Sequence, residues 1–251
     1  MPEILISNEN AIRILTLNRP EKRNALNDAL VDALKNALRE ADQNANLRAV
    51  VIKGAGKDFC SGADLSALRK IAESDVMENL ADAENLLELF ALIRKIKIPV
   101  IAAVHGRALA GGCGLATACD IVLAAKSARF GYPEVKIGFV AAMVMAILRR
   151  NTSEKRAFEL VTQGFDFSAD EAENFGLITR VFDDENFDEA VKDYVSVYEK
   201  VSHSVVVLSK KLLYQMDGMT FNTALETGAE INTIARLTED CQKGIARFLN
   251  K

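Results

Sequence analysis

The feature that most constrains this chain is a pattern, present twice, in which an apolar run passes through a glycine-rich turn into a helix. Residues 47–53 (LRAVVIK) are followed by Gly54 and Gly56, and residues 99–104 (PVIAAV) are followed by GRALAGGCGLATAC. A third apolar run, DIVLAA, begins at Asp120. Short apolar runs bounded by turn residues are typical of buried strands. Because these strands alternate with helices, the pattern predicts ββα units in an α/β fold rather than a β-sandwich.

The flanking segments complete a coarse map of the chain. Residues 3–7 and 11–17 are β-rich runs that predict an N-terminal hairpin. Asn27 is of a residue type that caps helices, and the apolar residues after it recur at helical spacing, which predicts a helix there. Residues 75–96 have an amphipathic pattern that predicts a second, long helix. From residue 153 the pattern is helical, apart from a short strand at 178–182. We therefore expect an α/β core over residues 1–195 and a helical region over residues 196–251.

The composition excludes several classes of protein. With 49% hydrophobic and 26% charged residues, the 251-residue chain has an ordinary globular composition. A net charge of −4 argues against a nucleic-acid binder, although the basic runs Arg94-Lys95-Ile96-Lys97 and Arg149-Arg150 are candidates for a local patch. Four cysteines without a CxxC spacing, together with two histidines, predict no metal site. The N-terminus lacks a signal-peptide pattern and the longest apolar stretch, IPVIAAV, is too short to cross a bilayer, so we expect a cytoplasmic protein.

Two turns are candidates for binding a carbonyl oxygen. They are residues 60–65 (CSGADL) and residues 108–114 (ALAGGCG), and each follows a strand and precedes a helix. Small residues let a ligand approach the main chain, and the first N–H groups of a helix have no partner within the helix. Two such turns that face each other would stabilise an oxyanion. The alternative is that the glycines only permit tight turns and close helix packing. The second turn lacks the G-x-G-x-x-G spacing of a dinucleotide site.

One carboxylate is a candidate acid–base group. Glu134 lies in the run FGYPEVKI, with Phe130, Val135 and Ile137 around it. A carboxyl group in apolar surroundings tends to have a raised pKa and can transfer protons. The alternative is a first-turn glutamate after a proline, stabilised by the helix dipole. Tyr132 lies two residues earlier and would face the same way in an extended segment.

The runs LNRPEKRNALN, DFCSGADL, IPVIAAVHGRALAGGCGLATACD and ARFGYPEVKIG resemble the crotonase superfamily of enoyl-CoA hydratases and isomerases. This resemblance implies a crotonase-like spiral of ββα units with a C-terminal helical trimerisation region, in homotrimers or in hexamers built from two trimers. It implies an acyl-CoA thioester substrate and no separate cofactor, because coenzyme A is part of the substrate. The thioester enolate would be stabilised by the N–H groups of Ala63 and Gly111. The residues that would line the substrate or its CoA moiety are Arg23, Ala25, Ser61, Asp64, Leu65, Gly112 and Gly114.

The chain departs from the family pattern at one catalytic position. Hydratases of this type carry two glutamates; Glu134 matches the second, but Gly114 stands where the first should be. A single glutamate is the pattern of the family's double-bond isomerases. The resemblance therefore leaves two reactions open, namely hydration of a 2-enoyl-CoA in fatty-acid or branched-chain acyl catabolism and isomerisation of a 3-enoyl-CoA to a 2-enoyl-CoA. A third possibility is a low-turnover protein that binds acyl-CoA or RNA.

The family resemblance and the positions of residues in the sequence also indicate roles outside these motifs. The resemblance places the acyl pocket beside residues 75–96 and 139–148, where Val140, Met143 and Met145 are either pocket or core residues. Asp120 and His105 are interpreted as structural residues. If Gly114 occupies the vacant acid position, Gly114→Glu is expected to raise hydration of crotonyl-CoA.

Overall fold

The computed structural model describes residues 1–250, without the side chains of Leu65 and Leu68. Its main sheet has six strands in the order β1-β2-β3-β4-β6-β9. The hairpin strands β1 and β2 are antiparallel, whereas β2, β3, β4, β6 and β9 pair in parallel. The strands span β1 (Ile4–Glu9), β2 (Ile12–Leu17), β3 (Ala49–Gly54), β4 (Val100–Val104), β6 (Ile121–Ala125) and β9 (Arg180–Phe182). The predicted hairpin and the predicted buried strands are confirmed.

A small second sheet joins three short segments of the chain, each of which leads directly into a helix. It contains β5 (Arg107–Leu109), β7 (Arg129–Gly131) and β8 (Asp166–Ser168), in that order. These strands could not be distinguished from the surrounding loops in the sequence. Each has only three residues, which is too short for a periodic pattern.

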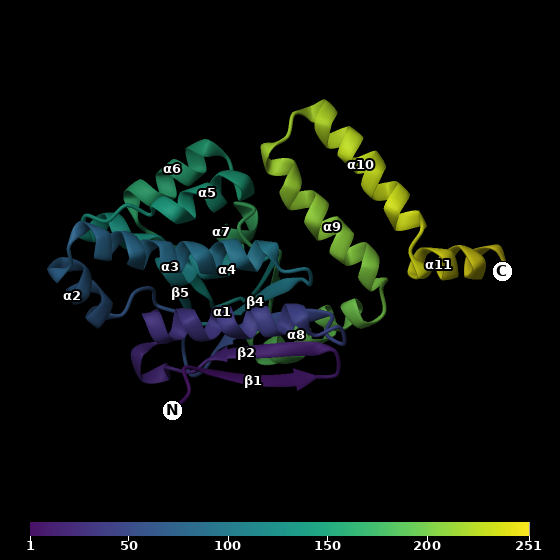
Figure 1. Ribbon diagram of the computed structural model, residues 1–251. Helices are drawn as coiled ribbons and strands as arrows, with labels where there is room; N and C mark the ends of the chain where they lie inside the picture. The colour runs from purple at the N-terminus through teal and green to yellow at the C-terminus, as the bar shows by residue number, and fades with distance from the viewer. Residues whose placement is uncertain (251) are drawn as a thin grey trace.

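Helices cover both faces of the main sheet (Figure 1). The core helices are α1 (Asp28–Gln43), α2 (Leu65–Glu73), α3 (Val76–Lys95), α4 (Gly111–Ala118), α5 (Ala142–Asn151), α6 (Glu154–Gln163), α7 (Ala169–Asn174) and α8 (Phe187–Ser196). The main core cluster joins α1, α3 and α4 to one face, and a second cluster joins α8 to the other through Phe187 and Val191. Because both faces are covered, the central strands are apolar throughout instead of alternating.

The C-terminal helices extend away from the sheet (Figure 1). They are α9 (His203–Gln215), α10 (Phe221–Arg236) and α11 (Glu239–Leu249), and α9 and α10 pack side by side. Neither α10 nor α11 contains a buried residue. The helical region is present as expected, and the boundary at residues 195 and 196 stays a prediction.

A buried ion pair joins α9 to the core. Lys210 Nζ lies 2.6 Å from Asp120 Oδ2 and donates to the carbonyl oxygens of Ile93 and Ile98 at 2.9 and 3.0 Å. The same Asp120 carboxylate accepts from the Tyr214 hydroxyl at 2.6 Å and from the Val100 N–H at 2.7 Å. Burial lowers the pKa of Lys210, and the Asp120 charge opposes that shift. Asp120 is therefore a structural residue, as its position in the sequence predicts.

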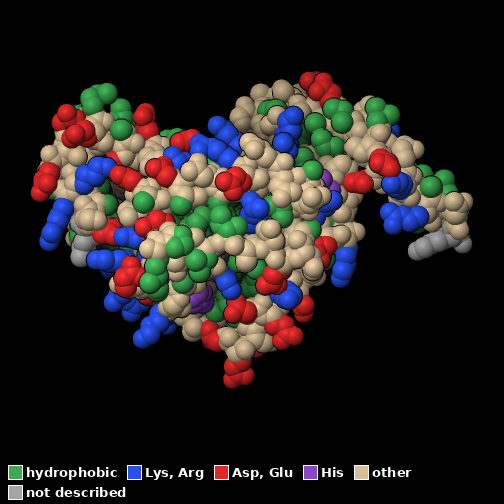
Figure 2. All heavy atoms as spheres, turned by 60° about the horizontal axis from the view of Figure 1, so that its bottom comes forward, with side chains coloured by type: hydrophobic (Ala, Val, Ile, Leu, Met, Phe, Trp, Pro, Cys, Tyr) green, Lys and Arg blue, Asp and Glu red, His purple; other side chains and the backbone are tan. Residues whose placement is uncertain are grey.

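Acidic and basic side chains alternate on the surface. Figure 2 shows them interspersed over the face it presents. Arg94 and Arg150 both pair with Asp217, and Arg149 pairs with Glu154. Arg94, Arg149 and Arg150 of the basic runs therefore already have acidic partners. Within residues 1–250, no helix is long and apolar enough to cross a bilayer.

Candidate active site

The first predicted turn is held by an adjacent segment of the chain. The Ser61 N–H donates to the Arg23 carbonyl at 3.0 Å, and the Leu26 N–H donates to the Gly62 carbonyl at 2.7 Å. The Asp64 N–H then donates to the Leu26 carbonyl at 2.9 Å, which completes a parallel bridge between Leu26 and Ala63. In this pairing the partners of Leu26 are the residues on either side of Ala63, so the N–H of Ala63 points away from Leu26. Within residues 1–250, no acceptor is recorded for that N–H, and Ala63 is exposed.

The side chains of Asn24, Arg19 and Asp64 hold the backbone of this turn and of the loop before it. Asn24 is fully buried in a left-handed conformation (φ 53°) and donates to the carbonyls of Ala55 and Asp58. Arg19 lies 2.7 Å from the Asp64 carboxylate, which also caps α2 by accepting from the Ser66 N–H at 2.9 Å. The hydrogen bond from the Ser66 backbone and the contacts with Arg19 hold the pKa of Asp64 at about 2, although burial opposes that shift. Asn24 and Arg19 lie in the LNRPEKRNALN run, but no local pattern marks either residue as part of the site.

The second turn presents the first N–H of α4. Ala110 precedes the helix in a strained conformation, with φ 49° and ψ −128°, and its own N–H donates to the Gly131 carbonyl at 2.9 Å. Gly111 begins α4, and its N–H has no recorded acceptor within the part of the chain that the structure describes. The strain at Ala110 has no signal in the sequence, because alanine is not typical of left-handed positions.

The two turns lie against each other. Cys60 and Ala108 form a parallel bridge, with hydrogen bonds of 3.0 Å from Cys60 N to Arg107 O and from Leu109 N to Cys60 O. A Cβ built on Gly62 would lie 2.8 Å from Ala110 Cβ and 3.7 Å from the Gly111 nitrogen. Side chains at Gly62 are thus excluded by contact with the second turn. The structure places the Ala63 and Gly111 turns side by side, as two groups that bind one oxygen require.

Glu134 lies on the short helix η2 (Pro133–Ile137), which follows β7. Burial raises the pKa of its carboxyl group above the ordinary value of 4.5, although a hydrogen bond from its own backbone partly opposes the shift. Its Oε2 atom is buried and has no hydrogen-bond partner among the described residues. A buried carboxylate oxygen without a partner is costly unless a ligand or a proton satisfies it. This environment suits a proton-transfer group better than a helix-dipole partner.

Tyr132 anchors the Glu134 segment to α4. It is fully buried, and its hydroxyl lies 3.2 Å from Thr117 Oγ1. Thr117 Oγ1 also donates to the Cys113 carbonyl of α4 at 2.9 Å. The same helix that begins at Gly111 therefore also holds the segment that carries Glu134.

Comparison with known proteins identifies the chain. The family profile described as Enoyl-CoA hydratase/isomerase matches residues 7–251. The chain belongs to the enoyl-CoA hydratase/isomerase family. It is 34% identical over 252 residues to the 2,3-dehydroadipyl-CoA hydratase of Escherichia coli strain K12, a match that covers 100% of this chain and 97% of that protein.

Solved structures of the family share this fold. The crystal structure of an enoyl-CoA hydratase from Mycobacterium smegmatis has a TM-score of 0.95 at 31% identity, covering 100% of this chain and 97% of that one. An enoyl-CoA hydratase from Polaromonas sp. JS666 has a TM-score of 0.94 at 29% identity, covering 98% and 96%. The predicted crotonase-like fold and the predicted class of enzyme, an enoyl-CoA hydratase or isomerase, are confirmed.

The position of the first family glutamate is closed. A Cβ built on Gly114 would lie 2.7 Å from Val144 Cγ2 and 3.1 Å from Phe90 Cζ. Both side chains are buried, each with an exposed fraction of 5%. Position 114 is therefore packed with apolar groups. Phe90 and Val144 lie in the two ranges that the family resemblance places beside the acyl pocket, but only the packing of α3 and α5 on α4 brings them together at Gly114.

The other residues predicted to line the substrate lie along the two turns. Arg23 is exposed in a left-handed conformation (φ 52°), Ala25 is buried and Ser61 is half-buried. The Asp64 side chain points inward to Arg19 rather than outward. Gly112 packs against the first turn, since a Cβ there would lie 2.2 Å from the Cys60 carbonyl oxygen. The Leu65 side chain lies outside the described part of the structure. Contact of any of these residues with CoA stays a prediction.

The segment after Glu134 is partly core. Met143 and Met145 are half-buried and pack against the main core cluster, whereas Val140 has an exposed fraction of 73%. The methionines therefore serve at least as core residues. Val140 is the member of the predicted acyl-pocket set that remains accessible.

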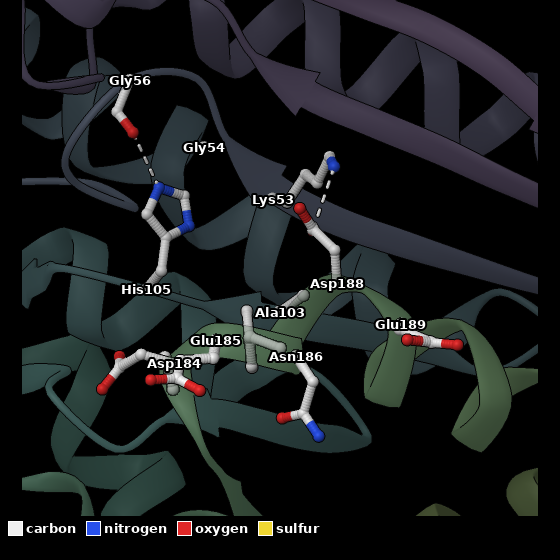
Figure 3. A pocket seen from close by; sticks show the side chains of 12 residues that line it. Lys53, Gly54, Gly56, Ala103, His105, Asp184, Glu185, Asn186, Asp188 and Glu189 are labelled. Atoms are coloured by element: carbon white, nitrogen blue, oxygen red, sulfur yellow. Dashed lines mark hydrogen bonds and ion pairs between the residues drawn. The ribbon is translucent and has the colours of Figure 1, made fainter.

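A separate cavity of about 600 Å³ lies beside α8 and contains none of the predicted catalytic residues (Figure 3). His105 Nε2 lies 3.0 Å from the Gly56 carbonyl oxygen, and Lys53 Nζ lies 3.4 Å from Asp188. Acidic side chains also line its wall, including Asp184 and Glu185. His105 is therefore a loop contact, as expected from the sequence. Among the described residues, no group of His, Cys, Asp or Glu is arranged to hold a metal ion.

Proposed function

We propose that this enzyme binds the carbonyl oxygen of an enoyl-CoA thioester at the N–H groups of Ala63 and Gly111 and moves protons with Glu134. The adjacent turns support the first part of the proposal. The buried Glu134 oxygen without a partner carries the second part. Oxyanion donors of this kind typically contribute about a hundredfold to a thousandfold in rate.

Hydration of a 2-enoyl-CoA is the reaction we propose first, because the similar proteins are named as hydratases. Glu134 would take a proton from water while the water oxygen bonds to the β-carbon. The electron pair of the double bond would move onto the thioester oxygen, where the two N–H groups stabilise it. Glu134 would then return the proton to the α-carbon, so that water is added and Glu134 ends ionised. One carboxylate is sufficient for both transfers when they occur in sequence.

Isomerisation of a 3-enoyl-CoA is the second candidate, and the packing at Gly114 favours it. Among the residues described around that position, Phe90 and Val144 are apolar and cannot hold a water molecule. Isomerisation needs no water. Glu134 would remove a proton from the α-carbon and return it to the γ-carbon, while the double bond moves into conjugation with the thioester.

The experiment that tests the proposal uses Glu134→Gln and a panel of 2-enoyl- and 3-enoyl-CoA substrates. Turnover is followed by mass spectrometry, since hydration adds the mass of water and isomerisation does not. We expect Glu134→Gln to lose about a hundredfold to ten-thousandfold in kcat. Glu185→Gln, in the cavity beside α8, is the matched control and is expected to retain activity. Near-normal turnover by Glu134→Gln would contradict the assignment.

Assembly into trimers or hexamers is also proposed, and the C-terminal helices support it. Helices α10 and α11 expose large apolar side chains, with exposed fractions from 46% to 80%, at Phe221, Leu225, Ile234, Ile245 and Phe248. Apolar groups at this density mark interaction surfaces. Light scattering would measure the mass, and a monomer at micromolar concentration would contradict this part of the proposal.

A further inference from the structure

Helix α4 connects the two groups that the proposed reaction uses. Its first residue, Gly111, presents the N–H proposed to bind the thioester oxygen, and the rest of the helix, Gly112–Ala118, is buried. Nearly two turns further along, Thr117 Oγ1 lies 3.2 Å from the hydroxyl oxygen of Tyr132, which is two residues before Glu134. One buried helix is therefore in contact with both the oxyanion position and the segment that carries the candidate acid–base group.

The backbone holds the Glu134 segment only at its start. The Gly131 carbonyl accepts from the Ala110 N–H at 2.9 Å, so the end of strand β7 is bonded to the residue before α4. The short helix η2 begins at Pro133 and has five residues. Because a short 3₁₀-helix has poor internal hydrogen-bond geometry, we infer that the orientation of η2 depends on contacts with the rest of the protein.

Tyr132 supplies a directional contact of this kind. Its buried ring lies 6.4 Å from the ring of Phe167, centroid to centroid. The chain at Gly164 also packs on η2, since a Cβ there would lie 2.9 Å from Val135 Cγ1 and 3.3 Å from Pro133 Cα. Such van der Waals contacts limit how closely the segments approach. A hydrogen bond between two buried hydroxyl groups also fixes their direction, and it is stronger than in water.

We propose that Tyr132 is a positioning residue, which uses its hydrogen bond to α4 to hold the Glu134 carboxyl group in place relative to the Gly111 N–H. This inference rests on the proposed function of the Ala63, Gly111 and Glu134 site. Tyr132 has an exposed fraction of 0%, so it acts through Glu134 and not by contact with the substrate. Misplacing a reacting group by about 1 Å can cost about a hundredfold in rate. Loss of the hydrogen bond should therefore slow the chemical step, whereas thioester binding to main-chain N–H groups should change little.

The test measures kcat and KM of Tyr132→Phe, Thr117→Val and Thr117→Ser on the enoyl-CoA that wild type turns over fastest. Tyr132→Phe keeps the buried ring and Thr117→Val keeps the side-chain volume, but each removes one hydroxyl group of the pair. We expect kcat to fall about tenfold or more in both variants, with KM within about threefold of wild type. Thr117→Ser retains the hydroxyl group and should keep kcat within about twofold of wild type.

A double variant and a distant tyrosine separate positioning from a general loss of stability. Because both single changes break the same contact, Tyr132→Phe combined with Thr117→Val should lower kcat no further than either change alone. The matched control is Tyr214→Phe, which removes a hydroxyl group that donates to Asp120 at 2.6 Å where α9 joins the core. Its kcat should equal that of wild type.

Three kinetic results would overturn the proposal. The first is a kcat within about twofold of wild type in folded Tyr132→Phe and Thr117→Val. The second is a Thr117→Ser variant as slow as Thr117→Val, or a double variant whose loss is the product of the single losses. The third is an equal loss of kcat in Tyr214→Phe, because that change is remote from Glu134.

A measurement without substrate separates this inference from the proposed function. Burial raises the pKa of the Glu134 carboxyl group, and its protonated infrared band can be assigned by its absence in Glu134→Gln. Release of the segment from α4 would expose the carboxyl group to water, so the pKa from titration of this band should be lower in Tyr132→Phe and unchanged in Tyr214→Phe. If no enoyl-CoA is turned over but the pKa responds in this way, the proposed reaction fails and positioning by Tyr132 stands. If there is no turnover and the pKa is unchanged in folded Tyr132→Phe, positioning is overturned as well.

Discussion

The contact between Gly114 and Val144 predicts an energetic coupling that can be measured directly. In Gly114→Ala the new Cβ would lie 2.7 Å from Val144 Cγ2, whereas carbon atoms normally contact at about 3.5–4.0 Å. Replacing glycine by alanine within a helix stabilises it by about 1 kcal/mol. Overpacking a core costs about 1–3 kcal/mol. Because the clash is nearly 1 Å and its partner is a short branched side chain, we expect the overpacking to prevail, with a net loss of about 1–2 kcal/mol.

Truncation of Val144 should reverse the sign of this substitution. Val144→Ala alone removes two buried methyl groups, and we expect it to cost about 2 kcal/mol. In the double variant the methyl group introduced at position 114 occupies part of the vacated space, so that the helix gain remains and the clash disappears. The double-mutant cycle should therefore give a favourable coupling of about 2 kcal/mol, which is within the range for residues in contact.

The measurement is urea unfolding followed by circular dichroism, at one protein concentration because assembly contributes to apparent stability. The control cycle pairs Gly114→Ala with Val191→Ala on the opposite face of the sheet. Those two changes should add within about 0.5 kcal/mol. A Gly114→Ala variant more stable than wild type, or additivity with Val144→Ala, would refute the packing argument at this position. Gly114→Glu places a carboxylate against the same two side chains, so we no longer expect it to raise hydration by itself.

Three further predictions concern other parts of the structure. Glu134→Gln should increase the free energy of unfolding at pH 7. Because the pKa of Glu134 is raised in the folded protein, ionisation of its carboxyl group destabilises the fold as the pH rises, and glutamine cannot ionise. The increase measured by urea unfolding should therefore vanish below about pH 4, where the carboxyl group is protonated in both states. Ala110→Gly should raise the free energy of unfolding by about 1 kcal/mol, since glycine relieves the strain at φ 49°; a clear loss of stability would contradict that strain. Lys210→Met leaves the Asp120 carboxylate buried without its cation and should cost about 3–5 kcal/mol in urea unfolding, whereas the exposed substitution Lys211→Met should change stability by less than about 0.5 kcal/mol.

The fold followed from features that are local in the chain. The apolar runs around Val50 and Ile101 predicted buried strands because both faces of a parallel sheet are covered. The cap at Asn27 and the periodicity after it predicted α1, and the Asn27 side chain accepts a hydrogen bond from the Leu30 N–H at 2.9 Å. The short strands of the second sheet were not predictable, because three residues carry no period and their pairing partners lie far along the chain.

The site was predictable only in part. Glu134 and the glycine turns stood out as residue types, and the family resemblance assigned them roles. The sequence did not indicate that Ala110 is strained, that Asp64 points inward to Arg19, or that Tyr132 holds the Glu134 segment against Thr117. Each of these depends on a contact between segments that are joined only by folding.

The amino-acid sequence by itself determined the N-terminal hairpin, the buried strands and the helical C-terminal region, the family, and the presence of one glutamate where the family pattern has two, because these are properties of residue type and spacing. Only the tertiary structure decided what surrounds position 114, where the first glutamate of the family pattern would stand. Phe90 and Val144 are 54 residues apart in the chain and ordinary apolar residues in their own helices. They meet over Gly114 because α3 and α5 both pack on α4, and a contact of that kind is set by how the helices pack rather than by any local pattern.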